Sequence, residues 1–167
     1  MGARGGFQVV TAEGAGRLRA LAEDGDEDVI ELFDELSDLK EYFDTDKAWD
    51  EIHRILNLDS EGGGELDPDA GDYPFCLLLF GGEQLYFGDD YHLYLIDPDG
   101  VADLASALSR VDEAWMRKRY WQLDLRRPDY WMSEEGFDYP FCNSRGLPEF
   151  FARAAAAGKA VVFYAGL

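Results

Sequence analysis

The residue types that most often carry chemistry in enzymes are scarce in this chain or lack the spacing that catalysis needs. Histidine occurs only as His53 and His92, and neither belongs to a His-Glu-x-x-His or comparable zinc-binding spacing. The two cysteines, Cys76 and Cys142, have no basic neighbour in the sequence that would favour a reactive thiolate. Gly-x-Ser-x-Gly, phosphate-loop and Gly-x-Gly-x-x-Gly motifs are also absent from the sequence. We therefore predict no catalytic residue, no metal site and no cofactor, and we expect both thiols to be reduced and dispensable.

One run of carboxylates has part of a calcium-loop spacing. Asp24, Asp26, Asp28 and Glu35 are spaced as the oxygen ligands of an EF-hand loop are. Val29 stands where that loop requires a glycine for its sharp turn, and the apolar pattern of the following residues continues through the proposed ligands. We interpret the run as a solvated acidic turn rather than a calcium site.

A candidate small-molecule pocket rests on an aromatic residue and a histidine one helical turn apart. A helix is predicted over residues 47–57, with Asp46 as its N-cap, and Trp49 lies on its apolar face. His53 follows one turn later, at the edge of that face. His53 is either a packed histidine that bonds to the backbone or part of a pocket lined by Trp49, His53 and Tyr139.

The charge of the chain restricts the partners that it can have. It carries 35 Asp and Glu against 15 Lys and Arg, a formal net charge of −20. A field of this sign opposes nucleic-acid phosphates and anionic lipids but attracts basic proteins, so we expect neither nucleic acid nor membrane as a partner. The alternative is that the charge serves only to keep the protein soluble. No apolar run approaches the roughly 18 residues of a membrane span. The first residues also lack the apolar stretch of a signal peptide, and the predicted location is cytoplasmic.

The basic residues gather in one stretch, which alternates them with aromatic residues. Residues 117–131 read RKRYWQLDLRRPDYW, a composition that single-strand nucleic-acid grooves use. The strongly negative chain disfavours that function. We expect these cations to pair with the acidic helices of the same protein while the aromatic side chains pack beneath them.

The strongest acidic surface is predicted on a helix over residues 28–43. Its apolar residues recur with helical periodicity from Val29 to Phe43. The opposite side of this helix would carry a stripe of carboxylates, which we take as the candidate partner-binding surface: Glu31, Asp34, Asp38 and Glu41.

Four strands are predicted from apolar and alternating runs. The strongest is 160–164 (AVVFY), whose unbroken apolar run indicates an interior strand buried on both faces, with 6–10 as its neighbour. Residues 83–87 and 91–96 flank a Gly-Asp-Asp turn and indicate a hairpin. Further helices are predicted after Asp97 and Asp112 and over 147–157. The expected fold is a single α+β domain over residues 1–167, a small mixed β-sheet with five or six surrounding helices.

Several segments together resemble a known family. They are the start Met1-Gly2-x-x-Gly5-x-Phe7, the helix containing Asp46-Lys47-Ala48-Trp49-x-x-Ile52-His53, the turn Gly81-Gly82-Glu83, the pair Tyr139-Pro140 and the end Gly158-Lys159-Ala160-Val161-Val162-x-Tyr164. In this order they resemble the YfbM-like family of small bacterial proteins, a domain of unknown function. The resemblance implies a single α+β domain and supplies no reaction.

Two classes of function agree with these observations. The first is a non-catalytic protein whose acidic surface binds a basic protein, as an antagonist or immunity-like protein would. The second is a small-molecule-binding protein or enzyme that uses the pocket near Trp49, His53 and Tyr139. The absence of catalytic motifs favours the first.

Overall fold

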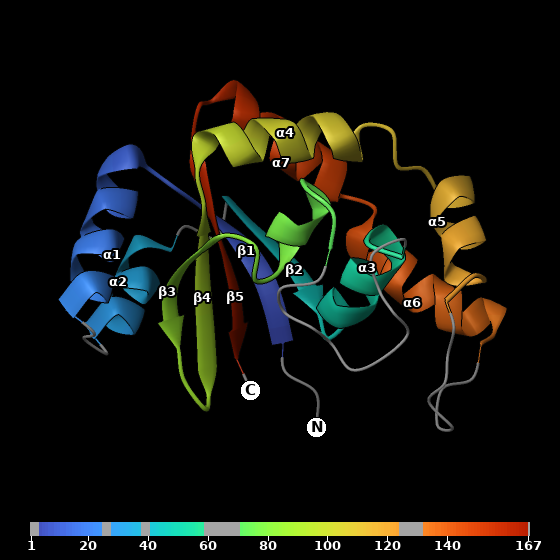
Figure 1. Cartoon of the computed structure of the whole chain (residues 1–167), viewed down its shortest axis with the longest axis horizontal. Helices are drawn as coiled ribbons and strands as arrows, with labels where there is room; N and C mark the ends of the chain where they lie inside the picture. Colours follow the sequence, from blue (N-terminus) through green and yellow to red (C-terminus); the bar gives the residue numbers. More distant parts are fainter. Residues whose placement is uncertain (1–3, 25–27, 38–40, 59–70, 124–131, 167) are drawn as a thin grey trace.

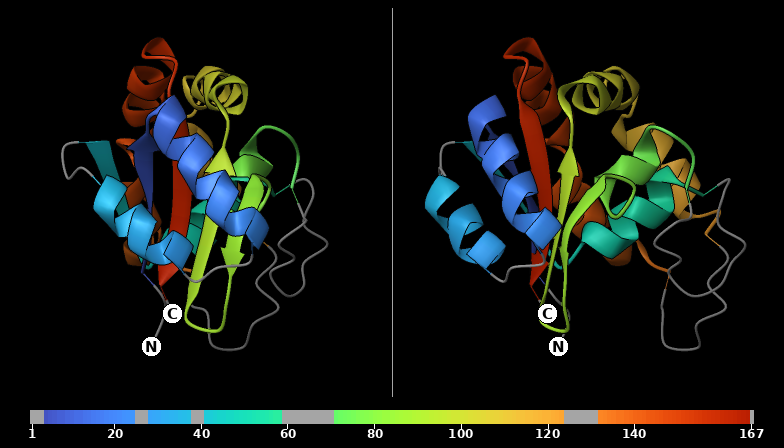
Figure 2. Two further views of the ribbon diagram at one scale, coloured as in Figure 1. Left: turned by 90° about the vertical axis from the view of Figure 1, so that its left-hand side faces the viewer. Right: turned by 60° about the vertical axis from the view of Figure 1, so that its left-hand side comes forward.

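The computed structural model of the chain describes residues 4–24, 28–37, 41–58, 71–123 and 132–166. A five-stranded sheet forms the centre of the molecule, and helices pack on both of its faces (Figures 1 and 2). The strands are β1 (Arg4–Val10), β2 (Tyr42–Asp46), β3 (Glu83–Phe87), β4 (Tyr91–Ile96) and β5 (Ala160–Gly166). The helices are α1 (Ala12–Asp24), α2 (Asp28–Leu36), α3 (Trp49–Leu56), the short 3-10 helix η2 (Phe75–Leu78), α4 (Pro98–Leu108), α5 (Glu113–Tyr120), α6 (Glu134–Ser144) and α7 (Leu147–Ala156).

The C-terminal strand occupies the middle of the sheet. The strand order is β2-β1-β5-β4-β3, so β5 pairs with β1 on one side and with β4 on the other. Val161 and Val162 of β5 are fully buried, because helices cover the strand from above and below. The predictions of an interior strand at 160–164, with 6–10 as its neighbour, are therefore confirmed.

The α+β class is confirmed, and the sheet is simpler than the expected mixed one. Each described pairing is antiparallel. The β3–β4 hairpin closes at Gly88, whose N–H donates to the carbonyl of Tyr91 at 3.0 Å. Antiparallel strands do not need the helical crossover that joins parallel strands. The helices can therefore pack as two groups, one on each face of the sheet. Seven α-helices surround the sheet in the described part of the chain, where five or six were expected.

The two helix groups cover opposite faces of the sheet. On one face α1 and α2 pack over Val10, Leu93 and Val162. On the other face α3, α4, α7 and η2 pack over Phe7 and Phe163 and over alternate residues of β4. Helices α5 and α6 lie outside α3 and build a smaller cluster with it (Figure 1). The alternation of side chains along each strand supplies both faces with apolar residues.

The long helix predicted over 28–43 is wrong, because the chain divides there into a helix and a strand. Helix α2 ends at Leu36, where the hydroxyl of Ser37 donates to the carbonyl of Phe33 at 3.0 Å. Phe43 belongs to β2 and pairs with Phe7 of β1. Its helical spacing from Val29 is coincidental, and pairing with a distant strand overrides the local pattern.

Helix boundaries that depend on capping residues were more accurate. The side chain of Asp97 accepts from the N–H of Gly100 at 2.7 Å, and that of Asp112 accepts from Trp115 at 2.8 Å. Both are N-caps, of α4 and α5, and these helices were predicted to follow Asp97 and Asp112. The prediction of Asp46 as a cap is wrong, because Ala48 precedes α3 and Asp46 has a positive φ of 51°.

Candidate functional site

The acidic surface that remains from the predicted stripe lies on α2. Glu31, Asp34 and Glu35 are exposed on the outer side of this helix. Val29, Leu32 and Phe33 are buried on its inner side against the sheet. Among the described residues, none of the three carboxylates forms an ion pair. Within the described part of the chain, this acidic face of α2 is therefore exposed and unpaired.

An open groove runs beside this face, between α1 and α2. Its volume is about 520 Å³. Its lining combines three carboxylates, three apolar residues and one arginine: Asp28, Glu31, Glu35, Ala20, Leu21, Leu32 and Arg17. The three carboxylates belong to α2, and Arg17 belongs to α1 on the other side of the groove.

The other two residues of the predicted stripe do not extend it. Asp38 lies outside the described residues. Glu41 precedes β2 rather than following Asp34 on one helix, and its two carboxylate oxygens accept from the Lys159 ammonium at 2.8 and 3.0 Å. Glu41 therefore ties the start of β2 to the connection between α7 and β5, which is a structural use of its charge.

The basic stretch does not neutralise α2 in the described part of the chain. Arg117 forms ion pairs with Glu113 at 2.9 Å and with Glu134, and its guanidinium lies 4.3 Å from the centre of the Phe137 ring. Arg119 donates to the carbonyl oxygens of Ile55 at 2.7 Å and Leu56 at 3.3 Å. Both arginines belong to α5, on the opposite side of the sheet from α2 (Figure 1). Arg126 and Arg127 lie outside the described residues.

The three residues predicted to line a pocket differ widely in exposure. His53 is 1% exposed, and its Nδ1 lies 3.1 Å from the Asn57 amide nitrogen. Tyr139 is 40% exposed, accepts from the N–H of Lys47 at 3.3 Å and donates to Asp46 at 2.9 Å. Trp49 packs edge-on against Phe163, with ring centres 6.1 Å apart. His53 thus packs within the core, whereas Tyr139 holds the turn that leads into α3.

Sequence reasoning missed a perturbed carboxylate on α3. Burial and the nearby Asp50 raise the pKa of Glu51 to about 7, against a smaller opposing effect of Arg54. One of its carboxylate oxygens is buried and has no hydrogen-bond partner among the described residues. Glu51 also makes a minor contribution to the raised pKa of Tyr139, whose main causes are burial and the hydrogen bond to Asp46. Its place one turn before the buried Ile55 was the available signal.

Metal-ligating and thiol groups do not form a site in the described part of the chain. No three His, Cys, Asp or Glu side chains among the described residues converge as metal ligands would. Cys76 and Cys142 are free thiols; Cys76 is half-buried and Cys142 is exposed. Burial raises the pKa of Cys76, which keeps it in the less reactive thiol form. No described helix is both long and apolar enough to cross a membrane.

Comparison with known proteins decides the family. The model of the family described as "Domain of unknown function (DUF1877)" matches residues 1–164. The chain belongs to the DUF1877 family. No curated protein sequence matches the chain.

A solved structure extends this result to the fold. The DUF1877 chain is similar to the crystal structure of YfbM from Escherichia coli, a protein of unknown function, with a TM-score of 0.66. The two are 19% identical, and the match covers 97% of this chain and 99% of YfbM. The resemblance to the YfbM-like family is confirmed, and at this identity the likeness establishes the shared fold alone. DUF1877 membership supplies no reaction.

Proposed function

We propose that this DUF1877 protein is a non-catalytic binding protein whose acidic face of α2 engages a basic protein partner, as an antagonist or immunity-like protein would. The supporting observation is a local lack of charge compensation. Glu31, Asp34 and Glu35 have no ion-pair partner among the described residues, whereas Glu41, Glu83 and Glu113 each have one. Uncompensated carboxylates on one helix steer a basic partner at long range.

The groove beside α2 gives the proposed contact its shape. Leu21 of α1 and Leu32 of α2 contribute to an apolar floor, and Glu31 and Glu35 stand along one side. An amphipathic basic helix would place apolar residues on this floor and its Lys or Arg residues against the carboxylates. Association would then depend on both charge and apolar contact, and added salt would weaken only the charge-dependent part.

A defined peptide probe tests this proposal. An amphipathic helical peptide made of Leu and Lys is titrated into the full chain by calorimetry, at about 0.05 M and about 0.3 M salt. A peptide made of Leu and Glu serves as the probe of opposite charge. We expect saturable binding of the Lys peptide that weakens at high salt, and no binding of the Glu peptide.

Two matched double variants locate the contact. Glu31→Gln with Glu35→Gln removes two charges from the acidic face of α2, whereas Glu135→Gln with Asp138→Asn removes two exposed charges from α6. We expect the first pair to weaken binding of the Lys peptide and to reduce its salt dependence, and the second pair to change little. If both variants lost the same affinity for the Lys peptide, binding would depend only on the net charge of the protein, and the proposal would be overturned.

A small-molecule site near Trp49, His53 and Tyr139 is the second candidate, and Glu51 is the observation in its favour. A carboxyl group with a pKa of about 7 can hold or accept a proton near neutral pH, as general acids and bases do. The test follows the Glu51 carboxyl by NMR during a pH titration, with and without added small amines. Amines that shift the Glu51 and Tyr139 signals saturably would support this candidate, and unchanged signals would remove it.

A further inference from the structure

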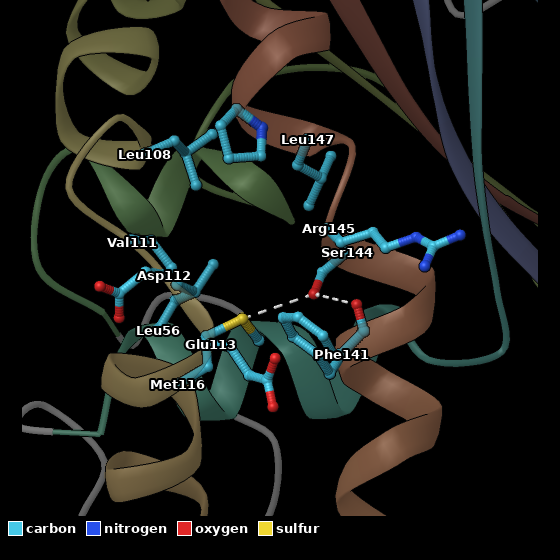
Figure 3. Close-up of a pocket in the computed structure, with 11 residues that line it drawn as sticks. Leu56, Leu108, Val111, Asp112, Glu113, Met116, Phe141, Ser144, Arg145 and Leu147 are labelled. Atoms are coloured by element: carbon cyan, nitrogen blue, oxygen red, sulfur yellow. Dashed lines mark hydrogen bonds between the residues drawn. The ribbon is translucent and has the colours of Figure 1, made fainter.

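A second cavity lies on the other side of the sheet from the acidic face of α2. It forms where the C-terminal end of α3, the α4–α5 connection and the α6–α7 connection meet (Figure 3). Its volume is about 190 Å³. Its lining is mostly apolar: Leu56, Leu108, Val111, Asp112, Glu113, Met116, Phe141, Ser144, Arg145, Leu147 and Pro148.

The apolar walls of this cavity are fixed by the packing of the core. Leu56, Leu108 and Leu147 also belong to the main hydrophobic cluster and are at most 3% exposed. Met116 is equally buried and projects from α5 into the cavity floor (Figure 3). Walls that already pack against the core need no rearrangement to receive a ligand, so binding would not have to order them first.

A single buried hydroxyl group gives the cavity its polar character. Ser144 is 5% exposed. Its hydroxyl can donate to the carbonyl oxygen of Phe141, 3.2 Å away, or to the sulfur of Met116, 3.5 Å away (Figure 3). One hydroxyl hydrogen serves these acceptors, and the lone pairs of Oγ are left to accept a hydrogen bond. The cavity therefore favours a ligand that donates one.

The charged groups of the lining exclude acids. Glu113 accepts from Arg117 at 2.9 Å, and Asp112 accepts from the N–H of Trp115 at 2.8 Å, so both carboxylates already have partners. The side chain of Arg145 points away from the cavity (Figure 3). Arg145 therefore supplies no cation inside the cavity, and the net charge of −20 disfavours an anionic ligand.

We propose that this cavity binds a neutral, one-ring phenol. An apolar cavity of roughly 150 Å³ is known to hold benzene, so 190 Å³ fits one ring with a small polar substituent. The ring lies among Leu108, Met116 and Phe141, where the thioether makes favourable contact with an aromatic edge. The phenolic hydroxyl donates to Oγ of Ser144. This site is independent of the acidic face of α2 and of the partner proposed for it.

The experiment compares phenol, benzene and benzoate as ligands of the full chain, with the methyl group of each methionine followed by NMR. We expect phenol to shift the Met116 signal saturably and the Met132 signal little, benzene to bind more weakly, and benzoate not to bind. Ser144→Ala should weaken phenol binding about threefold to tenfold and leave benzene unchanged, because it removes only the acceptor. Ser109→Ala, in an exposed serine outside the cavity, should change neither.

A variant that fills the cavity completes the test. Val111 is half-buried in its wall, and Val111→Phe should abolish both phenol and benzene binding while thermal unfolding shows that the chain remains folded. Loss of benzene and phenol affinity in equal measure in Ser144→Ala would contradict the assigned hydrogen bond. No shift of Met116 with either neutral compound, or binding of benzoate as tight as phenol, would overturn the proposal.

Discussion

Charged side chains have different surroundings on the two sides of the sheet. On the side of α5, Arg117 and Arg119 are used within the molecule, by carboxylates and by the carbonyl groups that end α3. On the side of α2, Glu31 and Glu35 face solvent without an ion pair among the described residues, and Arg19 of the neighbouring α1 pairs with Glu83 of β3 instead. Exposed carboxylates without an ion pair among the described residues also occur on α6, at Glu135 and Asp138. Those of α2 differ because they stand beside a groove, and for that reason we propose α2 as the surface for a basic partner.

Both helix layers pack against β5, so a substitution that disrupts this strand should have the largest effect on stability. Val162 is fully buried at the centre of the sheet. Val162→Asp places an unpaired carboxylate there, at an expected cost of about 5 kcal/mol or more, comparable to the whole stability of a domain. Circular dichroism should show a chain that does not fold. Val162→Ala, the control, should fold with a loss of about 2 kcal/mol; a folded Val162→Asp protein would contradict the placement of β5.

The strands and capped helices could be predicted from sequence because their signals are local. The apolar run at 160–164, the hairpin at Gly88 and the cap at Asp97 each concern a few adjacent residues. Strand β2 could not be predicted in this way, because its main stabilisation is pairing with β1, far away in sequence. Helix α6 was also missed, since Gly136 and Pro140 suggest a break, although the Ser133 side chain caps it at 2.9 Å.

The candidate site was predictable only in part, for the same reason. Glu31 and Asp34 were identified because they share a short helix with its buried residues. The ion pair of Glu41 with Lys159 and the burial of Glu51 are tertiary facts, and no local pattern contains them. The groove beside α2 likewise needs the packing of α1 against it.

Arg119→Ala tests whether an arginine of the basic stretch stabilises the fold. This change removes charged hydrogen bonds to two carbonyl groups and the contact of the guanidinium with the Trp115 ring, so we expect a loss of about 2 kcal/mol. Urea unfolding measures it. Arg153→Ala, which removes an exposed ion pair with Glu149, should cost less than about 0.5 kcal/mol. Equal effects of the two would contradict the structural role that we assign to Arg119.

Glu51→Gln tests whether a partly buried carboxylate affects the pH dependence of stability more than the solvated carboxylates of α2 do. The pKa of Glu51 is raised to about 7 in the folded protein, so the folded state holds a proton that the unfolded chain releases near pH 4.5. The free energy of unfolding therefore loses a contribution as pH rises from about 4.5 to about 7. Because part of the side chain still meets water, we expect the variant to be about 1–2 kcal/mol more stable at pH 8 and nearly unchanged at pH 4.

The control for this pH dependence is Glu31→Gln, which removes the same charge from an exposed position of α2. Unfolding curves of both variants and the parent at pH 4, 6 and 8 give the comparison. A Glu51→Gln protein whose stability relative to the parent is the same at every pH would refute the raised pKa.

The two cysteines should contribute little to stability and nothing to peptide binding. Cys76 and Cys142 are free, and neither forms part of the acidic face of α2. Changing both to Ala should lower the free energy of unfolding by less than about 1 kcal/mol, chiefly through lost packing at the half-buried Cys76, and should leave peptide binding intact. Loss of binding in the double variant, measured by calorimetry with the Lys peptide, would show that a thiol takes part in function.

The smallest change in stability is expected when the unpaired charges of α2 are reversed. Glu31→Lys with Glu35→Lys reverses the uncompensated charges of α2, and its free energy of unfolding and its affinity for the Leu–Lys peptide are measured together. Because these carboxylates are solvated, we expect a free energy of unfolding within about 0.5 kcal/mol of the parent and loss of salt-dependent binding. A double reversal that binds the peptide as the parent does, or that unfolds because an internal cation was needed, would contradict it.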